Sequence, residues 1–293
     1  MSNPRVPYQM STERKRLAPL RGKPLMVHVV INVEYWPFDQ AMPRAVLPAP
    51  HGKSPIPDVG NFAWVEYGMR AGLPRLLQLI TERGVAASTF MNAQCADVYG
   101  SAADAMLKAG WEFVGHGWTQ KSLQFEDDEA AVIAKSVERL ECLTGKKLRG
   151  WFGAGAGESF DTPDLIKAAG VDWLADWFLD DLPCWMRTKH GPLLAMPYTV
   201  ELNDVPLYAI QQQSSEEMLK RLETTVRVFE AGDQPKVLTI ALHPHVMGVA
   251  HRIDVLARCL DLLLARDDTI FVTGSEIADW FVGEDGTGGA AVA

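Results

Sequence analysis

The sequence of 293 residues lacks most of the features that assign a protein to a class at first reading. Its four cysteines lie too far apart for a C-x-x-C metal or redox motif. No apolar run reaches ~18 residues, and the N-terminus has no apolar stretch typical of a signal peptide. We therefore expect no membrane partner, and interpret the chain as a cytoplasmic protein whose cysteines fill the core.

An excess of positive charge is also missing. The chain has 37 acidic and 28 basic residues, a formal charge of −9. Because binding to a phosphate backbone favours a basic face, a nucleic-acid partner is not expected. The basic residues that cluster within residues 5–23 predict a solvated arm or a subunit contact.

Common catalytic motifs are absent as well. The sequence contains no G-x-S-x-G, no Walker A motif and no H-E-x-x-H. The glycine-rich residues 150–158 look like a dinucleotide loop, but Glu158 occupies the position that would complete G-x-G-x-x-G from Gly153. These glycines instead predict a pocket wall that presents backbone N–H groups.

What the sequence does contain is an alternation of strand and helix patterns along most of its length. This alternation predicts a parallel α/β sheet, and six to eight units favour a closed or nearly closed barrel. The predicted strands cover residues 25–34, 85–91, 111–114, 148–152, 171–175, 193–196, 206–210, 237–242 and 270–272. The predicted helices cover residues 73–83, 101–109, 128–143, 161–170, 214–230, 252–265 and 275–282.

No linker divides the chain, so we predict one catalytic domain over residues 25–282, with an N-terminal arm at 1–24 and a flexible tail at 283–293. Residues 37–57 contain six prolines, which excludes a helix or central strand there. A loop this long in a compact domain is typical of a lid, a binding loop or a subunit contact.

In a parallel barrel the active site lies where the strands end. Alternation along the first strand places His28, Asn32 and Glu34 on one face. His116 lies between two glycines after another strand, and His243 directly follows a late strand. Glu34, His116 and His243 are therefore the candidate catalytic residues. The alternatives are a structural salt bridge for Glu34, a turn position for His116 and a core position for His28.

Aromatic residues gather at the same predicted strand ends. An aromatic wall with a few polar groups is typical of a small-molecule pocket. The tryptophans that follow predicted strands are Trp36, Trp118, Trp151, Trp177 and Trp185, and Asp180 and Asp181 lie among the last of them.

Several motifs in this order resemble those of a known family. They are Asn32-Val33-Glu34, Ser88-Thr89-Phe90, Gly115-His116-Gly117-Trp118, Asp180-Asp181-Leu182-Pro183-Cys184-Trp185, the stretch from Pro197-Tyr198 to Asn203-Asp204, and Leu242-His243-Pro244-His245. From about residue 25 to 282 the chain resembles the polysaccharide-deacetylase (NodB-homology) superfamily. Within it the chain is similar to metal-independent allantoinases and bacterial cyclic imide hydrolases.

The resemblance implies a deformed, incomplete parallel (β/α) barrel of about seven strands, assembled as a homodimer or homotetramer, that hydrolyses a C–N amide bond. Deacetylases of this superfamily hold a divalent metal with an aspartate and two histidines. Here the matching positions are Glu34, His116 and Gln120, and Asn32 replaces the usual base. Since an amide is a poor zinc ligand, we expect no metal cofactor. The alternative is one zinc or other divalent ion held by Glu34, His116 and His243.

The resemblance thus predicts a cyclic amidohydrolase that opens succinimide- or dihydropyrimidine-like rings, with Glu34 or His243 as the base. The loop after the fourth strand lacks the arginine that the allantoinase branch often carries, which favours plainer cyclic imides. The alternatives are an allantoinase, a metal-dependent carbohydrate N-deacetylase, or a non-catalytic ligand-binding homologue. The predicted substrate-binding residues are Asn32, Trp118, Trp151, Asp181, Trp185 and Tyr198.

Overall fold

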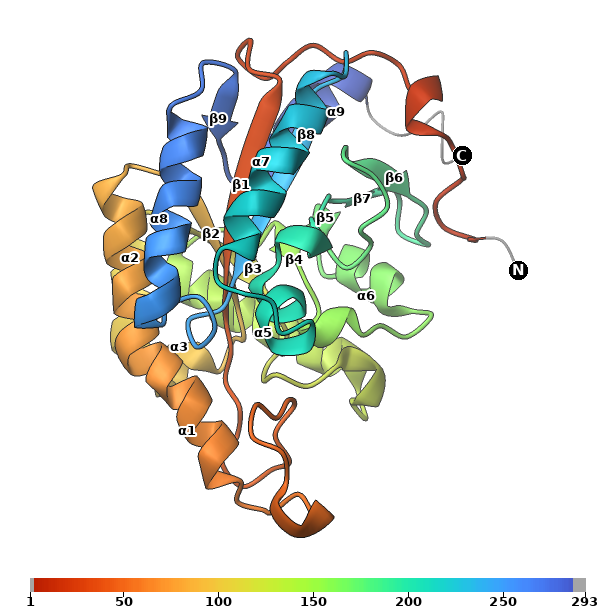
Figure 1. Cartoon of the computed structure of the whole chain (residues 1–293). Helices are drawn as coiled ribbons and strands as arrows, with labels where there is room; N and C mark the ends of the chain where they lie inside the picture. Colours follow the sequence, from red (N-terminus) through yellow and green to blue (C-terminus); the bar gives the residue numbers. More distant parts are fainter. Residues whose placement is uncertain (1–2, 287–293) are drawn as a thin grey trace.

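The computed structural model describes residues 3–286, which form one curled sheet with helices packed against it (Figure 1). The strand order is β6-β7-β5-β4-β3-β2-β1-β8, with β9 paired to the N-terminal half of β1. The sheet does not close, so the predicted incomplete barrel is confirmed. The strands are β1 (Leu25–Val33), β2 (Ala87–Met91), β3 (Glu112–Gly115), β4 (Gly150–Trp151), β5 (Trp173–Leu174), β6 (Cys184–Met186), β7 (Leu193–Ala195), β8 (Lys236–Leu242) and β9 (Thr269–Phe271).

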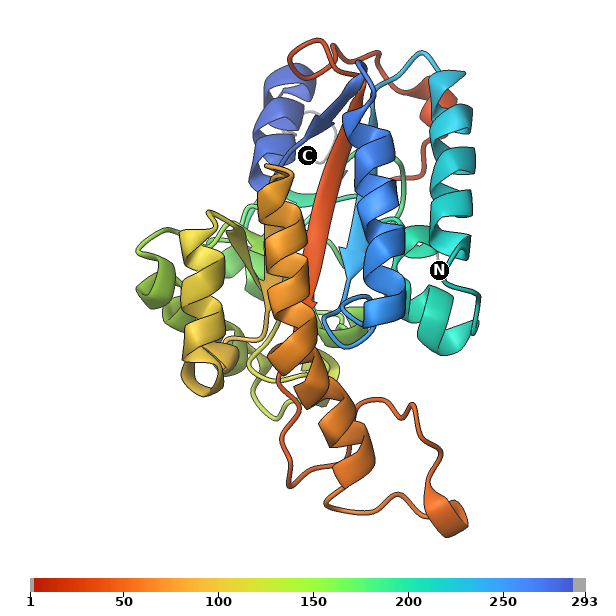
Figure 2. The same cartoon turned by 60° about the vertical axis from the view of Figure 1, so that its left-hand side comes forward.

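Helices lie along the outer side of this sheet, and α2 and α8 stand beside β1 and β8 (Figure 2). A π-helical turn, η3 (Gly68–Gly72), joins α1 to α2 in one long rod. The helices are α1 (Val59–Tyr67), α2 (Leu73–Glu82), α3 (Cys95–Val98), α4 (Gly100–Lys108), α5 (Glu129–Thr144), α6 (Thr162–Ala168), α7 (Glu217–Glu230), α8 (Ala250–Leu264) and α9 (Gly274–Asp285). No helix among residues 3–286 is long and apolar enough to cross a membrane.

Strand β1 is buried along its whole length and separates two apolar layers. Val27, Val29 and Ile31 face the layer beneath the helices, whereas Val30 faces the barrel interior. Because side chains alternate along a strand, His28 and Asn32 share the interior face with Val30. The same alternation brings Glu34 to the interior edge of the sheet, as the sequence predicts.

The structure differs from the sequence-based prediction in several segments, among them the short helix α3, which was not predicted. Residues 206–210 form part of a π-helical turn, η7 (Val205–Ile210), rather than a strand, and Pro206 near its start removes a backbone donor that a sheet would need. Helix α1 was not predicted, because it follows the proline-rich loop directly. Strand β6 was also missed, and it runs antiparallel to β7 at the open edge.

The N-terminal arm is packed on the domain rather than solvated. Arg5 donates both guanidinium ends to the carboxylate of Asp164, at 3.0 and 2.9 Å, and Arg14 pairs with Asp180 at 3.0 Å. Leu17 is buried beside the core. At the other end, α9 continues to Asp285, so the predicted tail begins later. Its residues 287–293 lie outside the described part of the chain.

We predict that Gly150→Ala destabilises the fold, because a Cβ at this buried position would overlap the indole ring of Trp173. Overpacking of this kind costs about 1–3 kcal/mol in the free energy of unfolding. The matched control is Gly283→Ala, an exposed position of α9 where a Cβ meets nothing and helix propensity favours alanine. Urea denaturation of both variants measures the difference, and equal midpoints would contradict the proposed overlap.

Candidate active site

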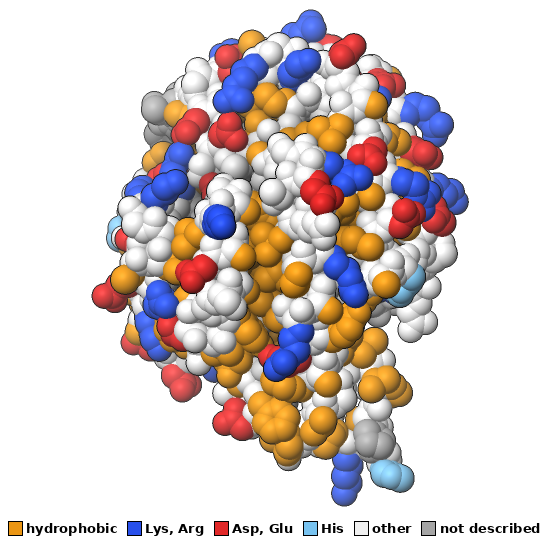
Figure 3. Space-filling model, turned by 90° about the vertical axis from the view of Figure 1, so that its left-hand side faces the viewer, with side chains coloured by type: hydrophobic (Ala, Val, Ile, Leu, Met, Phe, Trp, Pro, Cys, Tyr) orange, Lys and Arg blue, Asp and Glu red, His pale blue; other side chains and the backbone are white. Residues whose placement is uncertain are grey.

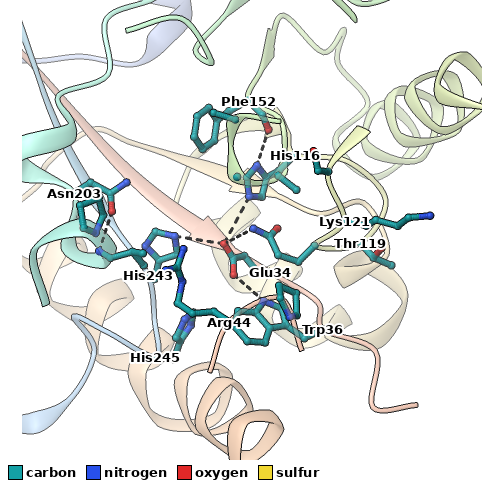
Figure 4. Close-up of a pocket in the computed structure, with 18 of the residues that line it drawn as sticks. Glu34, Trp36, Arg44, His116, Thr119, Lys121, Phe152, Asn203, His243 and His245 are labelled. Atoms are coloured by element: carbon teal, nitrogen blue, oxygen red, sulfur yellow. Dashed lines mark hydrogen bonds and ion pairs between the residues drawn. The ribbon is translucent and has the colours of Figure 1, made fainter. Parts of the chain in front are cut away.

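Three side chains from separate strand ends meet at the interior edge of the sheet. Glu34 follows β1, His116 follows β3 and His243 follows β8. The Nε2 atoms of His116 and His243 lie 3.8 Å and 3.4 Å from Oε1 of Glu34 (Figure 4). All three residues are buried. The structure therefore brings the three predicted catalytic residues together, although they are far apart in the sequence.

The carboxylate of Glu34 accepts a hydrogen bond at each oxygen. Trp36 donates its indole N–H to Oε2 at 2.8 Å, and Gln120 donates its amide N–H to Oε1 at 2.8 Å. Burial raises the pKa of Glu34, but the neighbouring imidazoles, above all the positive charge of His243, outweigh it and hold the pKa well below its usual range. Glu34 is therefore an ionised carboxylate at neutral pH.

His243 is oriented by Asp204, which the sequence analysis quoted in a motif but did not place in the site. The Nδ1 of His243 lies 2.6 Å from Oδ1 of Asp204, and its backbone N–H donates to Oδ2 at 2.7 Å. Burial lowers the pKa of His243, but the charges of Asp204 and Glu34 raise it overall to about 10. His243 is therefore an imidazolium that presents an Nε2–H to the cavity.

His116 has the opposite character. Its Nδ1 lies 2.6 Å from the carbonyl oxygen of Phe152, which can only accept, so the proton resides on Nδ1. The Nε2 has no hydrogen-bond partner among the described residues, and in the neutral tautomer with its proton on Nδ1 it would offer a lone pair. Gly117, at φ +79°, makes the turn that follows, a backbone conformation suited to glycine. The G-H-G sequence thus presents a buried, unpartnered basic nitrogen.

A cavity of about 600 Å³ opens beside these groups. Aromatic rings form much of its wall, and Phe152 stacks on both His116 and Tyr198. Predicted binding residue Tyr198 lines the cavity, whereas Asn32 lies beneath it and donates to the Tyr198 hydroxyl at 3.3 Å. Other lining side chains include Trp36, Arg44, Thr119, Phe125, Phe178, Asn203 and His245.

Two predicted binding tryptophans lie outside this lining. Trp151 is completely buried, and its ring covers Gly115, where a Cβ would overlap it. The ring of Trp118 faces away from the cavity, with the ammonium of Lys135 3.4 Å from its centroid. Trp118 follows β3 as predicted, whereas Trp151 is the last residue of β4 itself, and the strand pattern alone does not determine which side of the sheet such a ring occupies.

Asp181 and Trp185 also lie outside the lining. Asp181 pairs at 3.1 Å with Lys236, the first residue of β8, and so sits at the opposite end of the sheet from His243. Trp185 belongs to antiparallel β6 and donates its indole N–H to Asp285 at 2.9 Å. Asp181 lies seven residues beyond the end of β5, too far along the loop for the strand-end rule to place it, and Trp185 lies within an antiparallel strand, to which the rule does not apply.

The glycine-rich loop after β4 forms part of the cavity wall, as expected. Ala154, Gly155 and Ala156 line it. The Gly153 N–H, however, donates to the buried carboxyl of Asp176 at 2.7 Å and is not available to a ligand. Glu158 accepts from the indole N–H of Trp177 at 2.8 Å and lies outside the lining.

The side chains around Glu34 do not fit a divalent metal. Within residues 3–286, no group of three or more His, Cys, Asp or Glu side chains has an arrangement that could hold one. Each oxygen of Glu34 already accepts from an N–H group, and the amide N–H of Gln120 stands where a second imidazole ligand would be needed. A cation there would face a donor dipole rather than a lone pair.

The remaining histidines of this region are neutral. His245 lines the cavity between the rings of Trp36 and Trp64, and burial lowers its pKa to about 3. His28 lies deeper, bonded to Ser88 at 2.8 Å, and burial lowers its pKa to about 3 as well. His28 is thus the core histidine that the sequence analysis kept as an alternative.

The comparisons with known proteins agree with this fold. A family model described as polysaccharide deacetylase matches residues 63–173. A Schizosaccharomyces pombe protein, named as a candidate polysaccharide deacetylase, is 26% identical over 253 residues, covering 78% of each chain. The structure of a probable polysaccharide deacetylase from Pseudomonas aeruginosa PAO1 superposes with a TM-score of 0.81 at 25% identity, covering 92% of this chain and 95% of that one. The structure of PuuE allantoinase superposes with a TM-score of 0.80 at 23% identity, covering 96% and 95%.

We predict that Asp204→Asn lowers the pKa of His243 from about 10, because the variant loses the negative charge that favours the imidazolium. An opposite charge at this distance changes a pKa by roughly 1–3 pH units. NMR titration of the histidine rings measures the change. His28 is the internal control, since burial keeps it neutral in both proteins. An unchanged His243 midpoint would show that Asp204 does not set its charge.

Proposed function

We propose that this chain is a member of the polysaccharide deacetylase superfamily that hydrolyses the C–N bond of cyclic imides and related cyclic amides. One observation carries the proposal: an unpartnered basic nitrogen on His116 and an imidazolium on His243 flank the same carboxylate, where the donor set does not suit a metal. That arrangement supplies a base and an acid without a metal ion.

The shape of the cavity favours a small ring over a polymer. Pro37, Pro43 and Arg44 of the proline-rich loop line one side of it, opposite the loop after β4. A polysaccharide deacetylase would need a long open groove, which this loop would obstruct. The aromatic wall offers flat surfaces against which a planar ring can pack.

In the proposed reaction, His116 Nε2 removes a proton from water as the water oxygen attacks a ring carbonyl carbon. General base catalysis of this kind contributes typically 10²–10⁴-fold. The His243 Nε2–H donates to the developing oxyanion and then protonates the departing ring nitrogen. The carbonyl carbon gains a C–O bond and loses its C–N bond, so one water is consumed and a half-amide carboxylate forms.

This assignment differs from the sequence analysis in the residue that acts as the general base. The sequence analysis favoured Glu34 or His243, but the pKa of His243 is raised and that of Glu34 is well below its usual range. An imidazolium holds its proton, and a carboxylate of low pKa is a weak base. Glu34 instead stabilises the positive charge of His243 and fixes both imidazoles.

We predict that His116→Ala lowers kcat for succinimide opening at least 100-fold while the fold is retained, because the lone pair that accepts the water proton is lost. Wild-type protein dialysed against a strong chelator should keep its activity. The matched control is His190→Ala, an exposed turn position. Ring opening is followed by absorbance, with allantoin in parallel, and circular dichroism checks the fold.

Each alternative has its own outcome in that experiment. Preferred turnover of allantoin would indicate an allantoinase. Activity restored only by zinc, with acetate released from chitin oligomers, would indicate a metal-dependent deacetylase. Ligand binding without turnover of any ring would indicate a non-catalytic homologue. Any of these three results would overturn the proposal.

We also propose that the chain forms a homo-oligomer through the projecting segment of residues 37–59. Apolar side chains gather at this end of the molecule (Figure 3), and Leu47, Ile56 and Val59 are exposed by 56–62%. An apolar patch of this kind is unusual on an isolated chain. The same segment lines the cavity, so contact with a second copy of the chain would also restrict the motion of this part of the cavity wall.

We predict that a Leu47→Asp, Ile56→Asp double variant lowers the mass measured by light scattering, because charged side chains oppose burial of the patch. Phe160→Asp is the control, since Phe160 is 94% exposed on a different part of the surface. A monomeric wild-type protein, or a double variant of unchanged mass, would contradict the proposed interface.

A further inference from the structure

The cavity contains one cationic side chain that no carboxylate neutralises within the described residues. Of the two basic chains that line it, Lys121 pairs with Glu126 at 2.7 Å. The other is Arg44, which is half-buried and forms no ion pair or hydrogen bond with the described part of the chain. Figure 4 shows Arg44 on the side of the cavity where His243 and His245 lie.

The position of Arg44 is built into the fold. The backbone N–H groups of Val46 and Leu47, two and three residues after Arg44, donate to Oδ1 of Asn61 at 2.8 and 2.9 Å. Asn61 is buried on α1 and also donates to the Leu47 carbonyl at 3.1 Å. This clamp anchors the loop to a helix, so the backbone beside Arg44 is fixed next to the cavity that its side chain lines.

The cavity is also larger than a bare ring requires. Cavities of roughly 300–1,000 Å³ accommodate drug-sized ligands, and this one is about 600 Å³. A five- or six-membered ring placed against His116 and His243 leaves space in which a ring substituent would fit. Arg44 lines that same cavity.

The chemistry of the guanidinium selects the substituent. Arginine has five N–H donors and no acceptor, and its planar fork matches the two oxygens of a carboxylate. A ureido group matches less well, since it offers one oxygen and several N–H donors of its own. The chain carries a formal charge of −9, so an anionic ligand needs a local cation to hold it.

We propose that Arg44 is a specificity-determining residue that binds a carboxylate carried on the substrate ring. This inference rests on the proposed function of the same site and narrows its substrate class to cyclic imides with an acidic substituent. The guanidinium acts on binding and orientation, while the chemical step belongs to His116 and His243.

The experiment compares two rings, succinimide and a succinimide with a carboxymethyl substituent, in wild type, Arg44→Gln and Arg44→Lys. We expect wild type to prefer the carboxylated ring in kcat/KM. In Arg44→Gln that preference should fall at least tenfold, mainly through KM, and Arg44→Lys should be intermediate because it keeps the charge but loses the fork. Arg70→Gln is the control, because Arg70 lies on the helical rod that carries Asn61 and already pairs with Glu66.

A second measurement separates this inference from the proposed function. Calorimetry with the His116→Ala variant measures the Kd of the carboxylated ring without turnover, with and without Arg44→Gln. A weaker Kd on loss of Arg44 supports the anchor even if no ring is opened. Equal Kd values, or a wild-type preference for bare succinimide or for allantoin over the carboxylated ring, would overturn it.

Discussion

The buried carboxylate of Glu34 is the constraint on which the rest of the site depends. An ionised carboxylate in an apolar interior is costly unless donors surround it. Here Trp36 and Gln120 each donate an N–H, and His243 supplies a positive charge 3.4 Å away. These partners come from the ends of three different strands, so satisfying one charge fixes the relative positions of β1, β3 and β8 at the mouth of the cavity.

The buried histidines near this carboxylate fall into two groups that differ in pKa. His28 shows what burial alone does, since its pKa is lowered to about 3, and burial is also the largest of the effects that lower the pKa of His245 to about 3. His243 is equally buried, yet Asp204 and Glu34 raise its pKa to about 10. The contrast between a protonated and an unprotonated imidazole, which acid–base chemistry at neutral pH requires, therefore arises from the placement of two carboxylates rather than from exposure to solvent.

Local patterns in the sequence predicted the frame of this site better than its lining. The alternation of β1 and the strand-end rule were sufficient to select Glu34, His116 and His243. They failed where the position depends on packing between distant segments. Trp151 turns into the core because Gly115 leaves room for its ring. Asp181 lies at the other end of the sheet because the long loop after β5 carries it to Lys236 at the start of β8. Asp204 directly precedes the π-helical turn η7, and Arg44 lies in the proline-rich loop. Neither segment has a periodic pattern from which the direction of a side chain could be predicted.

The rod formed by α1, η3 and α2 links these two less predictable regions. Gly68 and Gly72 let the rod touch the backbone of the loop after β8, where any Cβ would overlap His245 or Pro244. Trp64 on the same rod donates to the His245 carbonyl at 3.0 Å, and Asn61 clamps the segment that carries Arg44. One helical element thus positions both the loop that carries His243 and the segment that carries Arg44. Because rigid elements place functional groups more accurately than free loops do, the packing of this helix, rather than the proline-rich loop itself, sets the position of that segment relative to His243.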